Sequence, residues 1–185
     1  MTDASLFAAD VYAWQGDITR LPVDAIVNAA NSALAGGGGV DGAIHRAAGP
    51  QLLQSCRQIG GCPPGNAVLT EGFALPAKFV IHAVGPIWRD GNSDEDEILA
   101  NCYRNSLKVA ATKVCRSIAF SAISTGVYGF PKEQAVKIAV AEVYAQLPLY
   151  PFINEVIFCC FDERMLDLYQ TELAQYPAPH HKAED

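Results

Sequence analysis

Positive charge is scarce in this 185-residue sequence. Thirteen Lys and Arg residues are outnumbered by twenty Asp and Glu residues, which gives a formal net charge of −7 at pH 7. A chain with this excess of negative charge is repelled by nucleic-acid phosphates and by anionic lipid surfaces. We therefore expect no nucleic acid and no membrane among the partners of the protein.

Long apolar runs are missing as well, and so is a signal peptide. No apolar stretch approaches the roughly 20 residues that a membrane-spanning helix needs. The first residues, Met1-Thr-Asp-Ala-Ser, contain neither the basic nor the apolar region of a secretory signal. These features predict a soluble, cytoplasmic protein.

Cysteine pairs with the CxxC spacing are absent. The sequence has six cysteines, but disulfide frameworks belong to short secreted chains with weak cores. Two of the cysteines are adjacent in an apolar run, where small buried thiols fit well. We interpret all six as reduced structural residues, namely Cys56, Cys62, Cys102, Cys115, Cys159 and Cys160.

The composition is that of a globular protein, with half of the residues hydrophobic and 18% charged. At about 150 residues per domain, the length predicts one domain. We place this domain at residues 1–176 and predict a flexible tail at residues 177–185, which includes His180 and His181.

Apolar runs of strand length alternate with stretches of helical periodicity. Several of the runs are apolar on both faces, as strands are when helices cover both sides of a sheet. This pattern predicts the α/β class, with ligand loops at the carboxyl ends of the strands. The predicted strands are 11–14, 25–27, 67–69, 79–84, 117–123 and 155–161, and apolar helical stripes occur within 99–114, 136–147 and 165–176.

Four successive glycines, Gly36 to Gly39, are more than a turn requires. Such a run indicates a backbone that bends sharply or lies against a ligand, and it leads into a helical pattern around Ile44. The free N–H groups at a helix N-terminus bind phosphate well. The segment satisfies GxGxxG, but no Asp or Glu follows between Gly42 and Thr70, so a dinucleotide fold is disfavoured. The sequence also lacks GK[ST], the end of the P-loop motif, which excludes a P-loop NTPase.

A second flexible loop, 124–131, joins a predicted strand to a predicted helix. Two such loops, neither with a buried lysine, are typical of a diphosphate site built from backbone N–H groups. Polar residues follow another strand at Asn28 and Asn31, and Asp41 and His45 begin the next helix. Taken singly, each has an ordinary structural interpretation, such as a helix N-cap for Asp41.

Four motifs in order carry a resemblance to a known family. They are Gly16-Asp-Ile-Thr19, Asn28-Ala-Ala-Asn31, the glycine run with the residues up to Gly49, and Ser124-Thr-Gly-Val-Tyr-Gly129. Together they resemble a macrodomain of the MacroD type, a branch that hydrolyses ADP-ribosyl esters, from about Val11 to Glu172. The resemblance implies a three-layer α/β/α sandwich around a six-stranded mixed sheet.

The resemblance also implies roles for individual residues at the adenine end. Asp17 matches the acid that accepts a hydrogen bond from the adenine amino group, with the Ile18 backbone beside it. Phe161 matches an aromatic residue that packs on the adenine ring. The alternatives are a simple turn at Asp17 and a core position for Phe161.

At the other end, the resemblance implies a diphosphate and ribose site. Phe130 matches an aromatic residue that closes over the distal ribose. Asn31 and Asp41 match the pair that positions this ribose and the attacking water, with Asp41 as general base and His45 in a supporting role. Since a helix N-terminus favours an ionised carboxylate, we expect a weak base, which suffices for an ester. The other implied ligand-binding residues are Asn28, Gly37, Gly38, Gly39, Val40, Ser124, Thr125, Gly126, Val127 and Tyr128.

The predicted activity is hydrolysis of O-acetyl-ADP-ribose to ADP-ribose and acetate, or release of mono-ADP-ribose from Asp and Glu side chains of proteins. The predicted partners are thus ADP-ribose, its esters and mono-ADP-ribosylated proteins. We expect no cofactor and no metal, since residues 33–43 contain neither Cys nor His for a zinc-dependent variant. The alternatives are a reader that binds ADP-ribose without catalysis, an ADP-ribose 1″-phosphate phosphatase, or an unrelated α/β protein.

Overall fold

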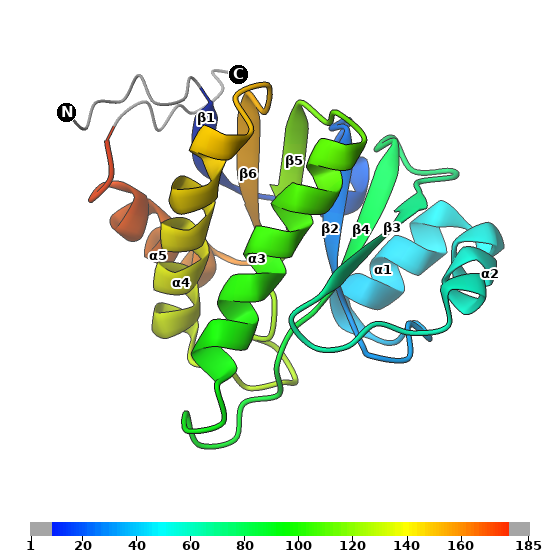
Figure 1. Ribbon diagram of the computed structural model, residues 1–185, viewed down its shortest axis with the longest axis horizontal. Helices are drawn as coiled ribbons and strands as arrows, with labels where there is room; N and C mark the ends of the chain where they lie inside the picture. Colours follow the sequence, from blue (N-terminus) through cyan, green and yellow to red (C-terminus); the bar gives the residue numbers. More distant parts are fainter. Residues whose placement is uncertain (1–8, 178–185) are drawn as a thin grey trace.

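The computed structural model describes residues 9–177, in which six strands form one mixed sheet (Figure 1). The spatial order is β1-β6-β5-β2-β4-β3, with β3 antiparallel at one edge and every other neighbouring pair parallel. The strands are β1 (Asp10–Gln15), β2 (Ala25–Ala30), β3 (Ala67–Glu71), β4 (Phe79–Val84), β5 (Ser117–Phe120) and β6 (Glu155–Cys160). Because five strands run the same way, the loops after them gather at one edge.

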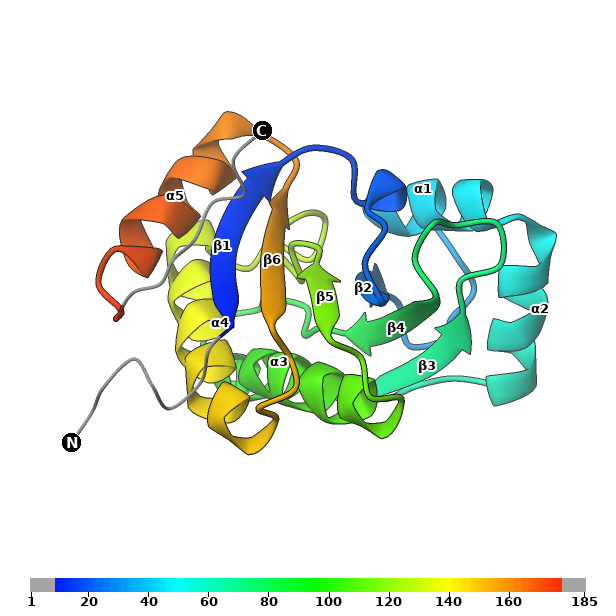
Figure 2. The ribbon, with the colours of Figure 1, turned by 90° about the horizontal axis from the view of Figure 1, so that it is seen from above.

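Helices cover both faces of the sheet, and Figure 2 shows α3 and α4 on the opposite side from α1. The helices are α1 (Gly39–Ala48), α2 (Pro50–Ile59), α3 (Glu95–Thr112), α4 (Lys132–Gln146) and α5 (Glu163–Leu173), with short 3-10 helices η2 (Ile18–Arg20) and η3 (Leu147–Leu149). Helices α3, α4 and α5 share one buried cluster with the sheet, and α1 and α2 contribute to clusters on the other face. The predicted three-layer α/β/α sandwich with a six-stranded mixed sheet is confirmed.

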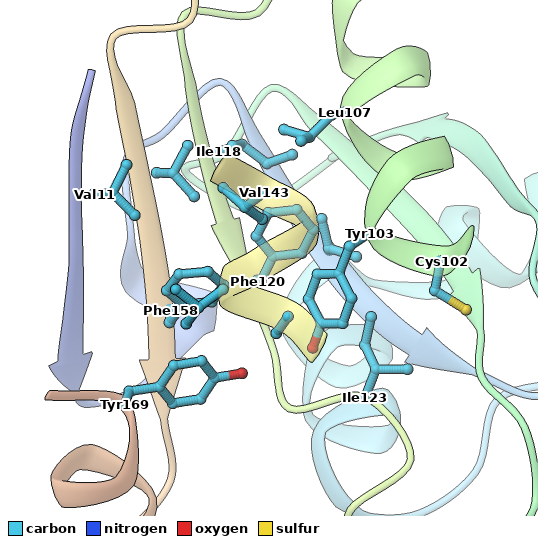
Figure 3. Packing of buried hydrophobic residues seen from close by; sticks show 14 of the residues in the cluster. Val11, Cys102, Tyr103, Leu107, Ile118, Phe120, Ile123, Val143, Phe158 and Tyr169 are labelled. Atoms are coloured by element: carbon cyan, nitrogen blue, oxygen red, sulfur yellow. The ribbon is translucent and has the colours of Figure 1, made fainter. Parts of the chain in front are cut away.

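The larger cluster is built on aromatic side chains from β5 and β6 (Figure 3). Phe158 lies with its ring centroid 5.9 Å from that of Phe120 and 4.6 Å from that of Tyr169. The residues just before these two phenylalanines, Ala119 and Ile157, face the other cluster. Both faces of each central strand are therefore buried, which explains why these strands are apolar throughout.

All six cysteines are buried and free. Burial raises the pKa of the Cys102 and Cys159 thiols to about 12, so the reactive thiolate is scarce at neutral pH. This burial agrees with their interpretation as structural residues, and their reduced state stays a prediction.

Two predicted strands end earlier in the structure than in the prediction. Strand β5 ends at Phe120, and the next residue, Ser121, donates through both its N–H and its hydroxyl to the Val27 carbonyl of β2. Strand β6 ends at Cys160, which leaves Phe161 beyond the sheet. Both differences place loop residues at the carboxyl edge.

None of the helices within residues 9–177 is long and apolar enough to cross a membrane. The predicted tail, including His180 and His181, lies outside the described residues except for Pro177. The boundaries of the single domain therefore stay a prediction.

Candidate functional site

A cavity of about 390 Å³ lies where β2, β4 and β5 end. This volume is within the usual range for a small-molecule site. The sequence-predicted residues that line it are Asn31, Gly37, Gly38, Gly39, Val40, Asp41, Ser124, Gly126, Val127 and Tyr128. The two loops that the sequence linked to a diphosphate therefore face each other across one cavity.

Asn31 holds the glycine loop in place through its side-chain amide. Its Nδ2 donates to the Gly36 carbonyl at 2.8 Å, and its Oδ1 accepts from the Ala35 N–H at 3.1 Å. Gly36 has a φ of +76°, a conformation that favours glycine. The loop is thus shaped by a side chain that also lines the cavity.

Asp41 is the third residue of α1 and is only 6% exposed. Its Oδ1 accepts a hydrogen bond from Asn28 Nδ2 at 2.8 Å and lies 3.3 Å from His45 Nε2, one helical turn on. The N-cap residue is Gly38, so the interpretation of Asp41 as the N-cap is wrong. Asp41 instead stands in the wall of the cavity, inside the first turn, where the helix dipole favours a negative charge.

The other oxygen of Asp41 faces the glycine loop. A Cβ atom at Gly37 would lie 3.5 Å from Asp41 Oδ2 and 3.9 Å from Asn31 Nδ2. The absence of a side chain at Gly37 therefore leaves open space beside both polar groups. Since Asn31, Gly37 and Asp41 all line the cavity of about 390 Å³, this space is open to a small reactant.

Asn28 does not take the ligand-binding position predicted for it. Its side chain is fully buried, does not line the cavity, and donates to Asp41 from behind. The same Nδ2 lies 3.2 Å from Nδ1 of His82, a residue that the sequence analysis did not select. The signal for His82 was a single imidazole in the otherwise apolar strand β4.

In the second loop, the Ser124 hydroxyl is engaged with the protein main chain. Ser124 has a φ of +66°, and its Oγ donates to the Pro86 carbonyl at 2.7 Å. The Trp88 N–H donates to the Tyr128 carbonyl at 2.8 Å, so the segment after β4 holds this loop from outside. The Ser124 side chain is therefore tied to the segment after β4, and the residue also lines the cavity.

Phe130 lies elsewhere than predicted. It is 2% exposed, belongs to the larger hydrophobic cluster, and packs against Trp88 with ring centroids 4.9 Å apart. It does not line the cavity that contains Asp41, whereas Tyr128 does. Phe130 is buried in the core and lines a second cavity beside the first, whereas Tyr128 is an aromatic residue of the first.

A neighbouring cavity of about 420 Å³ shares Gly126 with the first. It also contains Thr125, which the sequence assigned to the diphosphate loop, and Arg164 from the first turn of α5. The loop 124–130 thus borders two hollows, one on the side of Asp41 and one on the side of α5.

The predicted adenine residues lie at the ends of two adjacent strands. The Gly16 N–H donates to the Cys160 carbonyl at 3.1 Å. Asp17 and Phe161 directly follow these two bonded residues, so they lie close to each other in the chain fold. Phe161 is 92% exposed, so the core interpretation is wrong. An exposed aromatic face of this kind is available for stacking on a base.

Asp17 is exposed and caps η2, and Ile18 is buried below it. The Asp17 carboxylate accepts from the Thr19 N–H at 3.0 Å and the Thr19 hydroxyl at 2.7 Å. These bonds lower the pKa of Asp17, so it is an ionised acceptor at neutral pH. It therefore forms the predicted turn and still presents a negative acceptor to solvent.

The comparison with known families agrees with this geometry. The family model described as Macro domain matches residues 27–139, which include both loops and Asp41. The chain belongs to the Macro domain family.

Named relatives of this macrodomain cover nearly its whole length. A macro domain-containing protein of Chlorobaculum tepidum is 60% identical over 89% of this chain and 95% of its own. A protein of Klebsiella pneumoniae named O-acetyl-ADP-ribose deacetylase is 58% identical over 88% of this chain and 95% of its own.

Solved structures resemble the macrodomain in fold and in sequence. The Oceanobacillus iheyensis macrodomain with ADP has a TM-score of 0.84 and 43% identity, and covers 91% of this chain and 93% of its own. The Trypanosoma brucei macrodomain in complex with ADP-ribose has a TM-score of 0.82 and 43% identity, over 88% of this chain and 68% of its own. The family resemblance read from the four motifs is confirmed.

Proposed function

We propose that this macrodomain is a hydrolase that binds ADP-ribose and cleaves O-acetyl-ADP-ribose to ADP-ribose and acetate. The observation that carries the proposal is the Asp41 carboxylate, which has one oxygen bonded to Asn28 and the other facing the open space beside Gly37. Relatives at 58% identity that are named O-acetyl-ADP-ribose deacetylase support it.

In this proposal, backbone groups bind the nucleotide. The N-terminus of α1 and the loop 124–130 supply N–H groups for the diphosphate. Asp17 accepts from the adenine amino group, and Phe161 stacks on the ring. Tyr128, in place of Phe130, borders the distal ribose.

The reaction then needs one base and one water. Asp41 Oδ2 takes a proton from a water molecule held near Asn31, with help from a substrate phosphate oxygen, while the water oxygen attacks the acetyl carbonyl carbon. When the tetrahedral intermediate collapses, the bond between the acyl carbon and the ribose oxygen breaks. The proton goes to that oxygen, so the products are ADP-ribose and acetate. His45, close to Asp41 Oδ1, supports the carboxylate.

The same steps apply to an ester between ADP-ribose and an Asp or Glu side chain, so we also propose activity on mono-ADP-ribosylated proteins. No cofactor and no metal is part of this proposal. Within residues 9–177, no group of three or more His, Cys, Asp or Glu residues could hold a metal ion. The buried free cysteines support a reducing, cytoplasmic location.

The experiment that tests the proposal compares three readouts on the full chain. Calorimetric titration with ADP-ribose measures binding, and turnover is assayed on O-acetyl-ADP-ribose and, separately, on ADP-ribose 1″-phosphate. We expect binding and release of acetate, with slower or no release of phosphate. Binding without acetate release would favour a reader, and faster phosphate release would favour the phosphatase.

A further inference from the structure

Two polar side chains face each other inside the sheet, behind the cavity. Asn28 in β2 and His82 in β4 are register partners, 0% and 1% exposed. A buried polar group without a hydrogen bond is costly, so the partners of such groups constrain their orientation. Neither side chain lines the cavity that contains Asp41.

The distances fix the direction of each hydrogen bond. Asn28 Nδ2 lies 2.8 Å from Asp41 Oδ1 and 3.2 Å from His82 Nδ1. An amide nitrogen only donates and a carboxylate only accepts, so His82 Nδ1 must accept. The ring proton is therefore on Nε2, which lies 3.0 Å from Thr70 Oγ1 and 3.8 Å from Cys56 Sγ and can donate to the nearer Thr70 hydroxyl.

The contacts of Asn28 Nδ2 alone hold the amide. Among the described residues, Asn28 Oδ1 has no hydrogen-bond partner. If His82 did not accept at Nδ1, one of the two amide hydrogens would lose its acceptor and the side chain would be held by Asp41 only. Burial and the nearby His45 lower the pKa of His82 to about 3, so its ring stays neutral and Nδ1 stays an acceptor at neutral pH.

We propose that His82 is a positioning residue for the hydrolysis proposed above. It holds the Asn28 amide so that one N–H fixes Asp41 Oδ1 and Oδ2 is left directed at the space beside Gly37. The inference rests on the proposed function, because it assigns His82 an effect on the base of that reaction. Hydrogen bonds link four side chains in the order Thr70, His82, Asn28 and Asp41.

Two substitutions separate positioning from a purely structural role. In His82→Asn, the side-chain carbonyl can accept from Asn28 at the place of Nδ1. In His82→Gln, the longer side chain carries its amide toward the place of Nε2 and Thr70, so Asn28 loses its acceptor. We expect His82→Asn to keep kcat within about twofold and His82→Gln to lose about tenfold in kcat, because the base is misplaced. The Kd for ADP-ribose should stay unchanged in both.

Thermal unfolding of both variants gives the control for folding. Equal kcat for the two variants would overturn the proposal. So would a loss of kcat that parallels the fall in Tm and does not depend on whether residue 82 still accepts from Asn28. If either variant fails to fold, nitrogen NMR of the wild-type histidines decides. We expect an unprotonated Nδ1 for His82 from pH 5 to 8, and a protonated Nδ1 would overturn the assignment. A wild-type chain that releases no acetate contradicts the proposed function, whereas the NMR result tests the orientation of His82 independently.

Discussion

Asp41 shows how the chemistry depends on which oxygen of a carboxylate is free. Oδ1 is occupied by Asn28 and His45, and Oδ2 faces Gly37. A carboxylate with one oxygen held in this way cannot rotate freely, so its other oxygen keeps a constant direction. The sequence identified Asp41 and Asn31 correctly as neighbours of one cavity. It could not predict Asn28 behind Asp41, because that depends on how side chains pack across two strands.

The space beside Asp41 gives a first prediction. Gly37→Ala should fold normally, because Gly37 is not in the left-handed region and the new Cβ meets other atoms only at ordinary contact distance. The methyl group would nevertheless stand 3.5 Å from Asp41 Oδ2 and displace a reactant there. We expect kcat on O-acetyl-ADP-ribose to fall about tenfold with little change in Tm. Unchanged kcat would show that the reacting water lies elsewhere.

Phe161 gives a second prediction at this scale. Its ring is 92% exposed, so Phe161→Ala should not change Tm. Loss of base stacking should weaken ADP-ribose binding by about 1–3 kcal/mol, as measured by calorimetry. Leu149→Ala is the matched control, since Leu149 is 65% exposed and lines neither cavity. A Phe161→Ala variant with full affinity would refute the adenine assignment.

At the scale of elements, the segment between β4 and α3 holds the second loop in place. The Glu95 carboxylate accepts from the N–H groups of Arg89, Gly91 and Ser93, and this segment carries Trp88, whose N–H bonds to Tyr128. Those backbone bonds lower the pKa of Glu95 from 4.5 to about 2. Glu95 thus orders a segment that supports the wall of the cavity.

The Glu95 bonds predict a specific dependence on pH. Since the folded-state pKa lies below the unfolded value, the stabilisation is present above about pH 4.5 and is lost as the pH falls toward 2. Glu95→Gln should therefore lower the free energy of unfolding at pH 7 and flatten its decrease between pH 4.5 and 2. Denaturant titrations at a series of pH values measure this. If the free energy of unfolding falls with pH equally steeply in the wild type and in Glu95→Gln, the account is contradicted.

The elements were largely predictable, and the exceptions have physical causes. Alternation of apolar runs and helical stripes predicted the sheet and α3, α4 and α5, because burial on one or two faces gives the apolar residues a clear periodicity along the sequence. Helix α2 was not predicted separately, since it buries only Leu52 and Cys56 and shows a short stripe. The core position of Phe130 depends on packing against Trp88, which no local pattern records.

At the scale of the whole molecule, the parallel sheet gathers the candidate site from distant segments. Loops after β1, β2, β5 and β6 contribute Asp17, Asn31, Tyr128 and Phe161, which are spread over more than 140 residues of chain. The order of motifs along the sequence predicted this set, since the family resemblance fixes the topology. The contact between Asn28 and His82 follows from the β2–β4 register, which becomes visible only in the folded sheet.

The most direct test of the central claim separates binding from turnover in one variant. Asp41→Ala is compared with wild type and with Asp167→Ala, which removes an exposed carboxylate on α5. Acetate release from O-acetyl-ADP-ribose and calorimetric binding of ADP-ribose are measured on all three. The account predicts that Asp41→Ala loses turnover, binds ADP-ribose with nearly wild-type affinity and folds, while Asp167→Ala behaves as wild type. Wild-type turnover in Asp41→Ala would contradict it.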